Sequence, residues 1–107
     1  MGEEEVTRKM RFGIGMVVHH LHYDYRGVIM GADATCQADE AWYQKNRSQP
    51  DRDQPWYHVL VDGADHTTYV AQENLEQDPT GAPVVHPLLN RIFGTFLGGR
   101  YHREHLN

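Results

Sequence analysis

Little in the chain points to a secreted or membrane-spanning protein. Its 107 residues include a single cysteine, Cys36, and one cysteine excludes an intramolecular disulfide framework. No apolar run approaches the roughly 20 residues that a membrane-spanning helix needs, and no signal-peptide pattern is present. We therefore expect one intracellular domain, cytoplasmic or nuclear, with no membrane partner.

Positive charge is also scarce. Ten Lys and Arg residues against fifteen Asp and Glu residues leave a formal net charge of −5 at pH 7 with His neutral. Proteins that bind DNA through its phosphates need many Lys and Arg side chains, so we expect DNA binding to be weak and strongly salt-dependent at best. Eight histidines would move the net charge toward zero if several were protonated near pH 6, which would favour acidic partners.

Motifs for catalysis and for metal binding are absent from the sequence. It has no nucleophile elbow, phosphate loop or metalloprotease helix, so we expect no catalytic residue, no cofactor and no enzymatic activity. His20 and His22 would share a strand face, but no Cys pair or His-Glu motif supplies further metal ligands. We expect surface or partly packed histidines, and a small buried or loop cysteine at position 36.

What the sequence does contain is a β pattern centred on residues 53 to 63. β-Branched and aromatic residues there lie between a proline and an Asp-Gly turn, which predicts a strand that returns antiparallel through residues 67 to 71. Side chains alternate along a strand, so Tyr57 shares one face with Val59, and Trp56 shares the other with Leu60. Both faces are apolar, which indicates a strand near the middle of a covered sheet.

Three more strands and two short helices are predicted around this hairpin. Glycines before residues 16–20 indicate a turn into a first strand. Glycines within residues 25–33 indicate a bulge or a close backbone approach in a second, strongly curved strand. Asp39 is placed to cap a short helix that ends near Asn46, with Trp42 as its inward anchor. A brief fifth strand is expected at residues 84–86.

The second helix and the ends of the domain follow from the remaining sequence. Pro87 can occupy the first position of a helix whose apolar residues, from Leu88 to Phe93, dock on the sheet. We expect a mainly β domain at residues 11–97, with a disordered leader at residues 1–10 and a flexible tail at residues 98–107.

The aromatic residues carry the functional hypothesis. There are too many for one core of this size, so some are expected at the surface, where Trp or Tyr beside Arg or Lys suits either a protein anchor or stacked nucleobases. Trp42, Trp56 and Tyr57 could equally be structural, and Lys45 joins the arginines as a candidate phosphate contact. The candidate binding residues are Tyr25, Arg26, Trp42, Tyr43, Arg47, Arg52, Trp56 and His58.

Several segments, in the same order, resemble the YccV/HspQ family: Arg-Phe-Gly-Ile-Gly at 11–15, Tyr-Arg-Gly-Val at 25–28, the strand at 53–61, Tyr-Val-Ala-Gln-Glu-Asn-Leu at 69–75, and His86-Pro87. The resemblance implies an SH3-like β-barrel of about five antiparallel strands, with a short inserted helix and a short C-terminal helix, and no catalytic activity. The family takes its name from hemimethylated-DNA binding, and bacterial members also act as adaptors of ATP-dependent proteases.

Residues 32–36 and 71–76, with Phe93, Phe96 and Tyr101, look like the C-terminal YccV domain of a eukaryotic F-box protein, which is a ubiquitin-ligase substrate receptor. The resemblance therefore implies a protein adaptor or substrate-recognition module in regulated proteolysis. Its partner would be a protease, a ubiquitin-ligase component or a degradation substrate. Recognition of hemimethylated DNA is the alternative.

Overall fold

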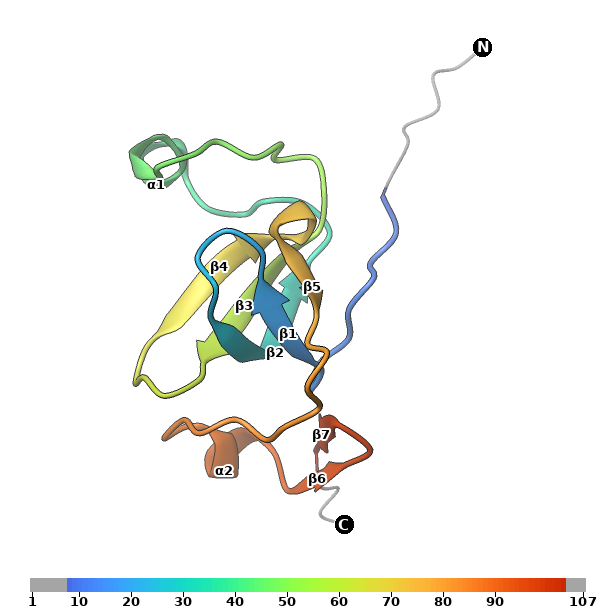
Figure 1. Ribbon diagram of the computed structural model, residues 1–107. Coiled ribbons are helices and arrows are strands. Elements are labelled where there is room, and N and C mark those ends of the chain that lie inside the picture. The colour runs from blue at the N-terminus through green and yellow to red at the C-terminus, as the bar shows by residue number, and fades with distance from the viewer. Residues whose placement is uncertain (1–7, 104–107) are drawn as a thin grey trace.

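The computed structural model describes residues 8–103 and shows a five-stranded antiparallel sheet with a separate two-stranded hairpin (Figure 1). The large sheet has the strand order β4-β3-β2-β1-β5, and the hairpin pairs β6 with β7. The elements are β1 Val17–His20, β2 Arg26–Asp33, α1 Glu40–Lys45, β3 Trp56–Val61, β4 Thr67–Ala71, the 3-10 helix η1 Gln72–Asn74, β5 Leu75–Gln77, α2 Leu89–Ile92, β6 Thr95–Leu97 and β7 Arg100–His102. The mainly β prediction, with an inserted helix and a C-terminal helix, is confirmed.

The predicted bulge lies in the longest strand. In the pairing of β2 with β3, Ile29 faces Val59 and Gly31 faces His58, so Met30 has no partner in register. An extra residue of this kind bends a strand and increases its twist. The sheet accordingly curls, and β1 and β5 lie in front of β3 and β4 in the view of Figure 1.

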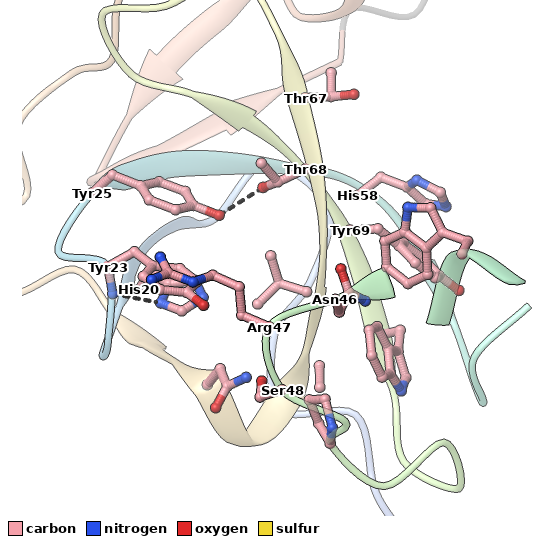
Figure 2. A pocket seen from close by; sticks show the side chains of 16 residues that line it. His20, Tyr23, Tyr25, Asn46, Arg47, Ser48, His58, Thr67, Thr68 and Tyr69 are labelled. Atoms are coloured by element: carbon pink, nitrogen blue, oxygen red, sulfur yellow. Dashed lines mark hydrogen bonds between the residues drawn. The ribbon is translucent and has the colours of Figure 1, made fainter. Parts of the chain in front are cut away.

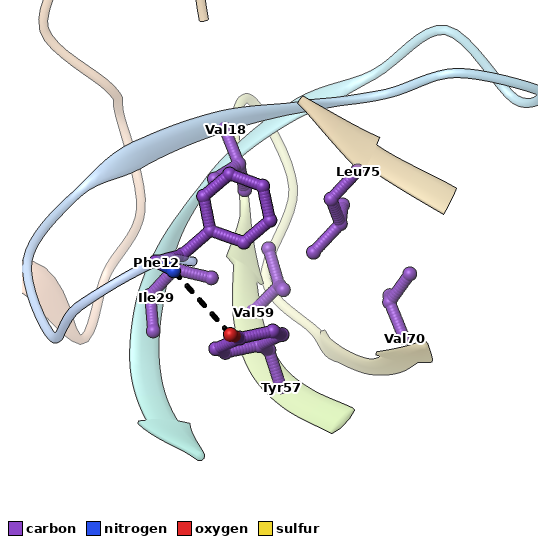
Figure 3. Packing of buried hydrophobic residues seen from close by; sticks show 7 residues of the cluster. All are labelled: Phe12, Val18, Ile29, Tyr57, Val59, Val70 and Leu75. Carbon is purple, nitrogen blue, oxygen red and sulfur yellow. Dashed lines mark hydrogen bonds between the residues drawn. The ribbon is translucent and has the colours of Figure 1, made fainter. Parts of the chain in front are cut away.

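The inner face of the curled sheet encloses the main core (Figure 3). Phe12, from the segment before β1, packs edge-on against Tyr57 with ring centroids 5.5 Å apart, and its backbone N–H donates to the Tyr57 hydroxyl at 3.3 Å. Burial raises the pKa of that hydroxyl. The buried members of this core are Phe12, Val18, Ile29, Tyr57, Val59, Val70 and Leu75.

The outer face of β3 is covered at both ends. Leu60 packs beneath the C-terminal segment, where Val84, Leu89 and Phe93 are buried against it. Trp56 packs beneath the segment that carries α1. The predicted burial of both faces of β3 is therefore confirmed, and the two covering segments are distinct parts of the chain.

The fifth strand lies where the sequence did not predict it. After β4 the chain turns through η1 and pairs with β1 as β5, with Leu75 opposite His20. The predicted strand at residues 84–86 is wrong, because the backbone there finds other partners. The N–H of Val84 donates to the Tyr101 hydroxyl at 2.8 Å, and that of Val85 donates to the Asp62 carboxylate at 2.8 Å.

Both predicted chain ends also need correction within the described residues. Residues 98–103 are no flexible tail, since β7 pairs with β6 and the Tyr101 ring packs 4.6 Å from that of Phe96. At the other end, the Gln72 side chain donates to the carbonyl of Lys9 at 2.9 Å, and Arg8 pairs with Asp51 at 3.0 Å. Residues 1–7 of the predicted leader and 104–107 of the predicted tail lie outside the described residues.

Candidate functional site

An open pocket of about 650 Å³ lies along β4 (Figure 2). All five residues of β4 contribute to its lining. Opposite them are the connection between β1 and β2, at residues 20–25, and the segment that follows α1, at residues 46–50. The pocket therefore joins one strand edge to two loops from distant parts of the sequence.

Helix α1 supplies one aromatic wall of this pocket. The Asp39 carboxylate accepts a hydrogen bond from the backbone N–H of Trp42 at 2.9 Å, which caps the helix as predicted. The half-buried Trp42 ring then packs edge-on against Trp56 at 6.1 Å and against Tyr69 at 5.7 Å between centroids. Trp56 itself is only 1% exposed, so it supports the wall and Trp42 presents the accessible surface.

Arg47, in the segment after α1, reaches the connection between β1 and β2 across the pocket. The Arg47 guanidinium carbon lies 5.9 Å from the centroid of the Tyr23 ring, within the range of a cation–π contact. Figure 2 shows the Arg47 side chain extending from the α1 segment toward Tyr23. Tyr23 is 53% exposed and Arg47 is also exposed, so both remain accessible to a ligand.

His20 and Tyr25 form the side of the pocket that lies against the sheet. The Tyr25 hydroxyl lies 2.7 Å from that of Thr68, which ties the start of β2 to β4, and burial raises the pKa of Tyr25. The His20 ring is 4% exposed and stacks on Tyr23 at 4.7 Å. Its Nδ1 accepts from the backbone N–H groups of His22 and Tyr23, each at 3.1 Å, so the proton of the neutral ring is on Nε2. Burial lowers the pKa of His20, which keeps the ring neutral.

The pocket has a local charge opposite to that of the chain. No Asp or Glu of residues 8–103 lines it, although the chain has fifteen acidic residues, and Arg47 is its charged residue. Asp33 stands behind Tyr69, whose hydroxyl donates to it at 2.6 Å, and it lies 3.4 Å from His58. Burial, and then this bond to a carboxylate, raise the pKa of Tyr69. Asp33 is therefore engaged by Tyr69 and His58 and does not line the pocket.

The outer edge of β4 carries free backbone groups. The backbone N–H of Val61 donates to the carbonyl of His66, and the backbone N–H of Gln72 donates to that of Pro55. In an antiparallel pair every second residue bonds to the neighbouring strand, so these two bonds decide which residues of β4 face β3. By that alternation Thr67 and Tyr69 direct their N–H and C=O groups away from β3. Neither residue has a backbone hydrogen-bond partner within residues 8–103.

Of the eight predicted binding residues, the structure brings five to the pocket. These are Tyr25, Trp42, Arg47, Trp56 and His58. Tyr43 and Arg52 lie beside it, where the Arg52 guanidinium carbon is 4.8 Å from the centroid of the Tyr43 ring. Arg52 also pairs with Glu40 at 3.4 Å and donates to the carbonyl of Ala38.

Arg26 is the predicted residue that lies elsewhere. Its guanidinium pairs with Asp62 at 2.9 Å and with Asp78 at 3.2 Å, and it donates to the carbonyl of Ala82. Burial opposes ionisation of Asp78, but hydrogen bonds from Thr80 and the charge of Arg26 outweigh it and lower the pKa of that carboxyl. Arg26 therefore holds the C-terminal segment against the sheet.

His20 and Tyr69 line the pocket but were not among the predicted binding residues, and no particular strand edge was predicted as part of the site. His20 was weighed as a metal ligand against a surface or partly packed histidine, and the sequence carries no signal that it is buried beneath Tyr23. Within residues 8–103 no three His, Cys, Asp or Glu side chains gather in a way that could hold a metal ion. The same residues include no helix long and apolar enough to cross a membrane.

The comparisons with known proteins cover nearly the whole chain. A family model described as hemimethylated DNA-binding protein YccV like matches residues 10–100. The chain is 38% identical over 101 residues to F-box only protein 21 of Mus musculus, and 36% identical over 101 residues to F-box only protein 21 of Homo sapiens. Each match covers 92% of this chain and 16% of the relative, so the chain spans a small part of those proteins. With the motifs and the fold, these matches show that the chain belongs to the YccV-like family of hemimethylated DNA-binding domains.

Proposed function

We propose that this domain is a non-enzymatic, intracellular protein-recognition module, acting as an adaptor or substrate-recognition unit in regulated proteolysis. The observation that carries the proposal is the open pocket along β4, walled by Trp42, Tyr23 and Tyr69 beside an unpaired strand edge. Trp, Tyr and Arg supply much of the affinity where proteins meet. Pocket aromatics that are partly accessible, with Arg47 among them, fit that use.

The proteolysis context comes from the relatives. Proteins named F-box only protein 21 contain a region similar to nearly all of this chain, and that region is 16% of their length. A region of that size suits a recognition module attached to a larger assembly. On this basis the pocket would bind a degradation substrate, a ubiquitin-ligase component or a protease.

The test is affinity capture from cell extract by the immobilised domain, compared with Arg47→Ala and with Arg91→Ala as a control. Arg91 is exposed on α2, outside the pocket. We expect protease subunits, ligase components or short-lived proteins to be retained by the native domain and by Arg91→Ala, and lost by Arg47→Ala. Retention of none of these classes, together with tight DNA capture, would refute the proposal.

DNA recognition is the second candidate, and the family description favours it. An exposed Tyr23 with Arg47 over its ring could stack on an unpaired base. The phosphate-binding capacity is nevertheless small, because Arg26 and Arg52 are already paired with carboxylates. Few neutralised phosphates give weak, salt-sensitive binding.

Hemimethylated, fully methylated and unmethylated duplexes should be titrated with the domain at physiological salt. We expect affinities weaker than micromolar, with little difference among the three duplexes. Submicromolar affinity with a clear preference for the hemimethylated duplex would make DNA recognition the main function.

A further inference from the structure

We infer that the pocket takes an extended peptide segment that pairs with β4 as an added strand and directs an Asp or Glu side chain to Arg47. The inference rests on the proposed function, since it names the kind of protein segment that the domain would recognise. It follows from three features of the pocket: the free edge of β4, the absence of acids from the lining, and two unpaired donors.

The edge of β4 provides the backbone part of the interaction. Thr67 and Tyr69 each offer one N–H and one C=O on the side away from β3, and these groups have no partner within residues 8–103. Such an edge is a template for an extended peptide, whose own backbone supplies the complementary groups. The pocket runs along all of β4, so a bound segment would lie in it lengthwise.

The charge of the pocket lining favours an acidic side chain on the bound peptide. Arg47 reaches into the pocket, where its guanidinium packs on the Tyr23 ring. No carboxylate of residues 8–103 lies within 4.0 Å of it. A peptide carboxylate would therefore meet an uncompensated cation and no acid. A Lys or Arg side chain would meet like charge, although the domain as a whole is acidic.

His20 adds a second donor beside Arg47. Its ring is 4% exposed, lies in the pocket wall, and uses Nδ1 for two backbone N–H groups. The remaining nitrogen, Nε2, carries a proton and has no partner within the described residues. A ligand that accepts a hydrogen bond from this N–H would add to the interaction with Arg47. Both His20 and Arg47 contact the Tyr23 ring, so the two donors lie on the same side of the pocket.

The test uses pools of ten-residue peptides, acetylated and amidated at their ends, with Glu, Asp, Gln or Lys fixed at one central position and the other positions randomised. The native domain should retain the Glu or Asp pool about tenfold better than the Gln pool and should retain the Lys pool least. Arg47→Ala should remove this preference, whereas Arg91→Ala should keep it.

A second arm tests strand pairing. Selected peptides are N-methylated at one backbone position at a time, and binding should fall at every second position, because alternate N–H groups of an added strand face β4. Equal retention of all four pools, or no alternation on methylation, would overturn the inference.

Failure of this inference can be told apart from failure of the proposed function. Retention of no pool overturns the added-strand inference, while capture of ligase components or protease subunits by the same domain would still support protein recognition. If no pool is retained and no ligase component, protease subunit or short-lived protein is captured, while DNA is captured tightly, both the inference and the proposed function are refuted.

Discussion

The indole ring of Trp42 on α1 meets that of Trp56 on β3 edge to face, with centroids 6.1 Å apart and an angle of 71° between the rings. This contact fastens the inserted segment to the sheet and so builds one wall of the pocket. The two rings nevertheless differ in burial: Trp56 is 1% exposed, whereas Trp42 is half-buried. They should therefore respond differently to truncation.

Replacing Trp56 by Ala should lower the free energy of unfolding by about 3 to 5 kcal/mol, because it removes a fully buried ring from between α1 and β3. Trp42→Ala should cost less stability but should weaken partner binding by about 2 kcal/mol, since this ring is accessible in the pocket. Urea melts and binding titrations of the two variants separate the effects. A Trp42→Ala variant that binds as the native domain does would contradict this division.

Arg26→Ala should destabilise the domain without acting through the pocket. The Asp78 side chain is 2% exposed, and the variant would leave its carboxylate without a cation. Breaking a buried pair in this way costs about 3 to 5 kcal/mol. Arg91→Ala, on the surface, should change stability by less than about 0.5 kcal/mol. If the double variant Arg26→Ala with Asp78→Asn recovered no stability in urea melts, the buried charge would not be the cause.

The hydroxyl of Tyr101 should contribute to stability, although the sequence predicted a flexible tail there. It accepts from the N–H of Val84 at 2.8 Å and lies 3.2 Å from that residue's carbonyl oxygen. Tyr101→Phe should cost about 1 kcal/mol in thermal or urea unfolding. Tyr23→Phe is the matched control, because that hydroxyl has no recorded partner in residues 8–103 and its change should have no effect. Equal stability of both variants would show that the Tyr101 hydroxyl does not contribute to stability.

His19 should make stability depend on pH. Its ring nitrogens bond to Asp24 at 2.7 Å and to Glu76 at 2.8 Å, and these bonds raise its pKa above 6.5. A raised pKa in the folded state gives stabilisation that is complete below pH 6.5 and is lost as pH rises through the folded value. The stability difference between the native domain and His19→Gln should therefore be larger at about pH 6 than at about pH 8. A difference independent of pH would contradict this assignment.

Local patterns in the sequence were sufficient to predict the central hairpin, the α1 cap and the bulge. Each depends on residues close in sequence: the Asp-Gly turn after Val61, the Asp39 cap, and Gly31 within β2. The curl of the sheet follows from the bulge, and the burial of both faces of β3 was predicted from the apolar residues on each face of that strand.

The features that sequence did not predict depend on distant contacts. Arg26 was taken for a binding residue because its partners, Asp62 and Asp78, lie 36 and 52 positions away, and no local pattern shows them. Residues 84–86 have strand-like composition, yet Tyr101 and Asp62 take their backbone bonds. The pocket likewise exists only where three segments meet.

The most direct test of a protein-binding pocket along β4 is amide hydrogen exchange of the domain alone and with a captured partner protein. The predicted result is slower exchange at Thr67 and Tyr69, whose N–H groups have no partner among residues 8–103, and in residues 42–48. Unchanged exchange along β4, with protection confined to β6 and β7 or seen only on adding DNA, would contradict it.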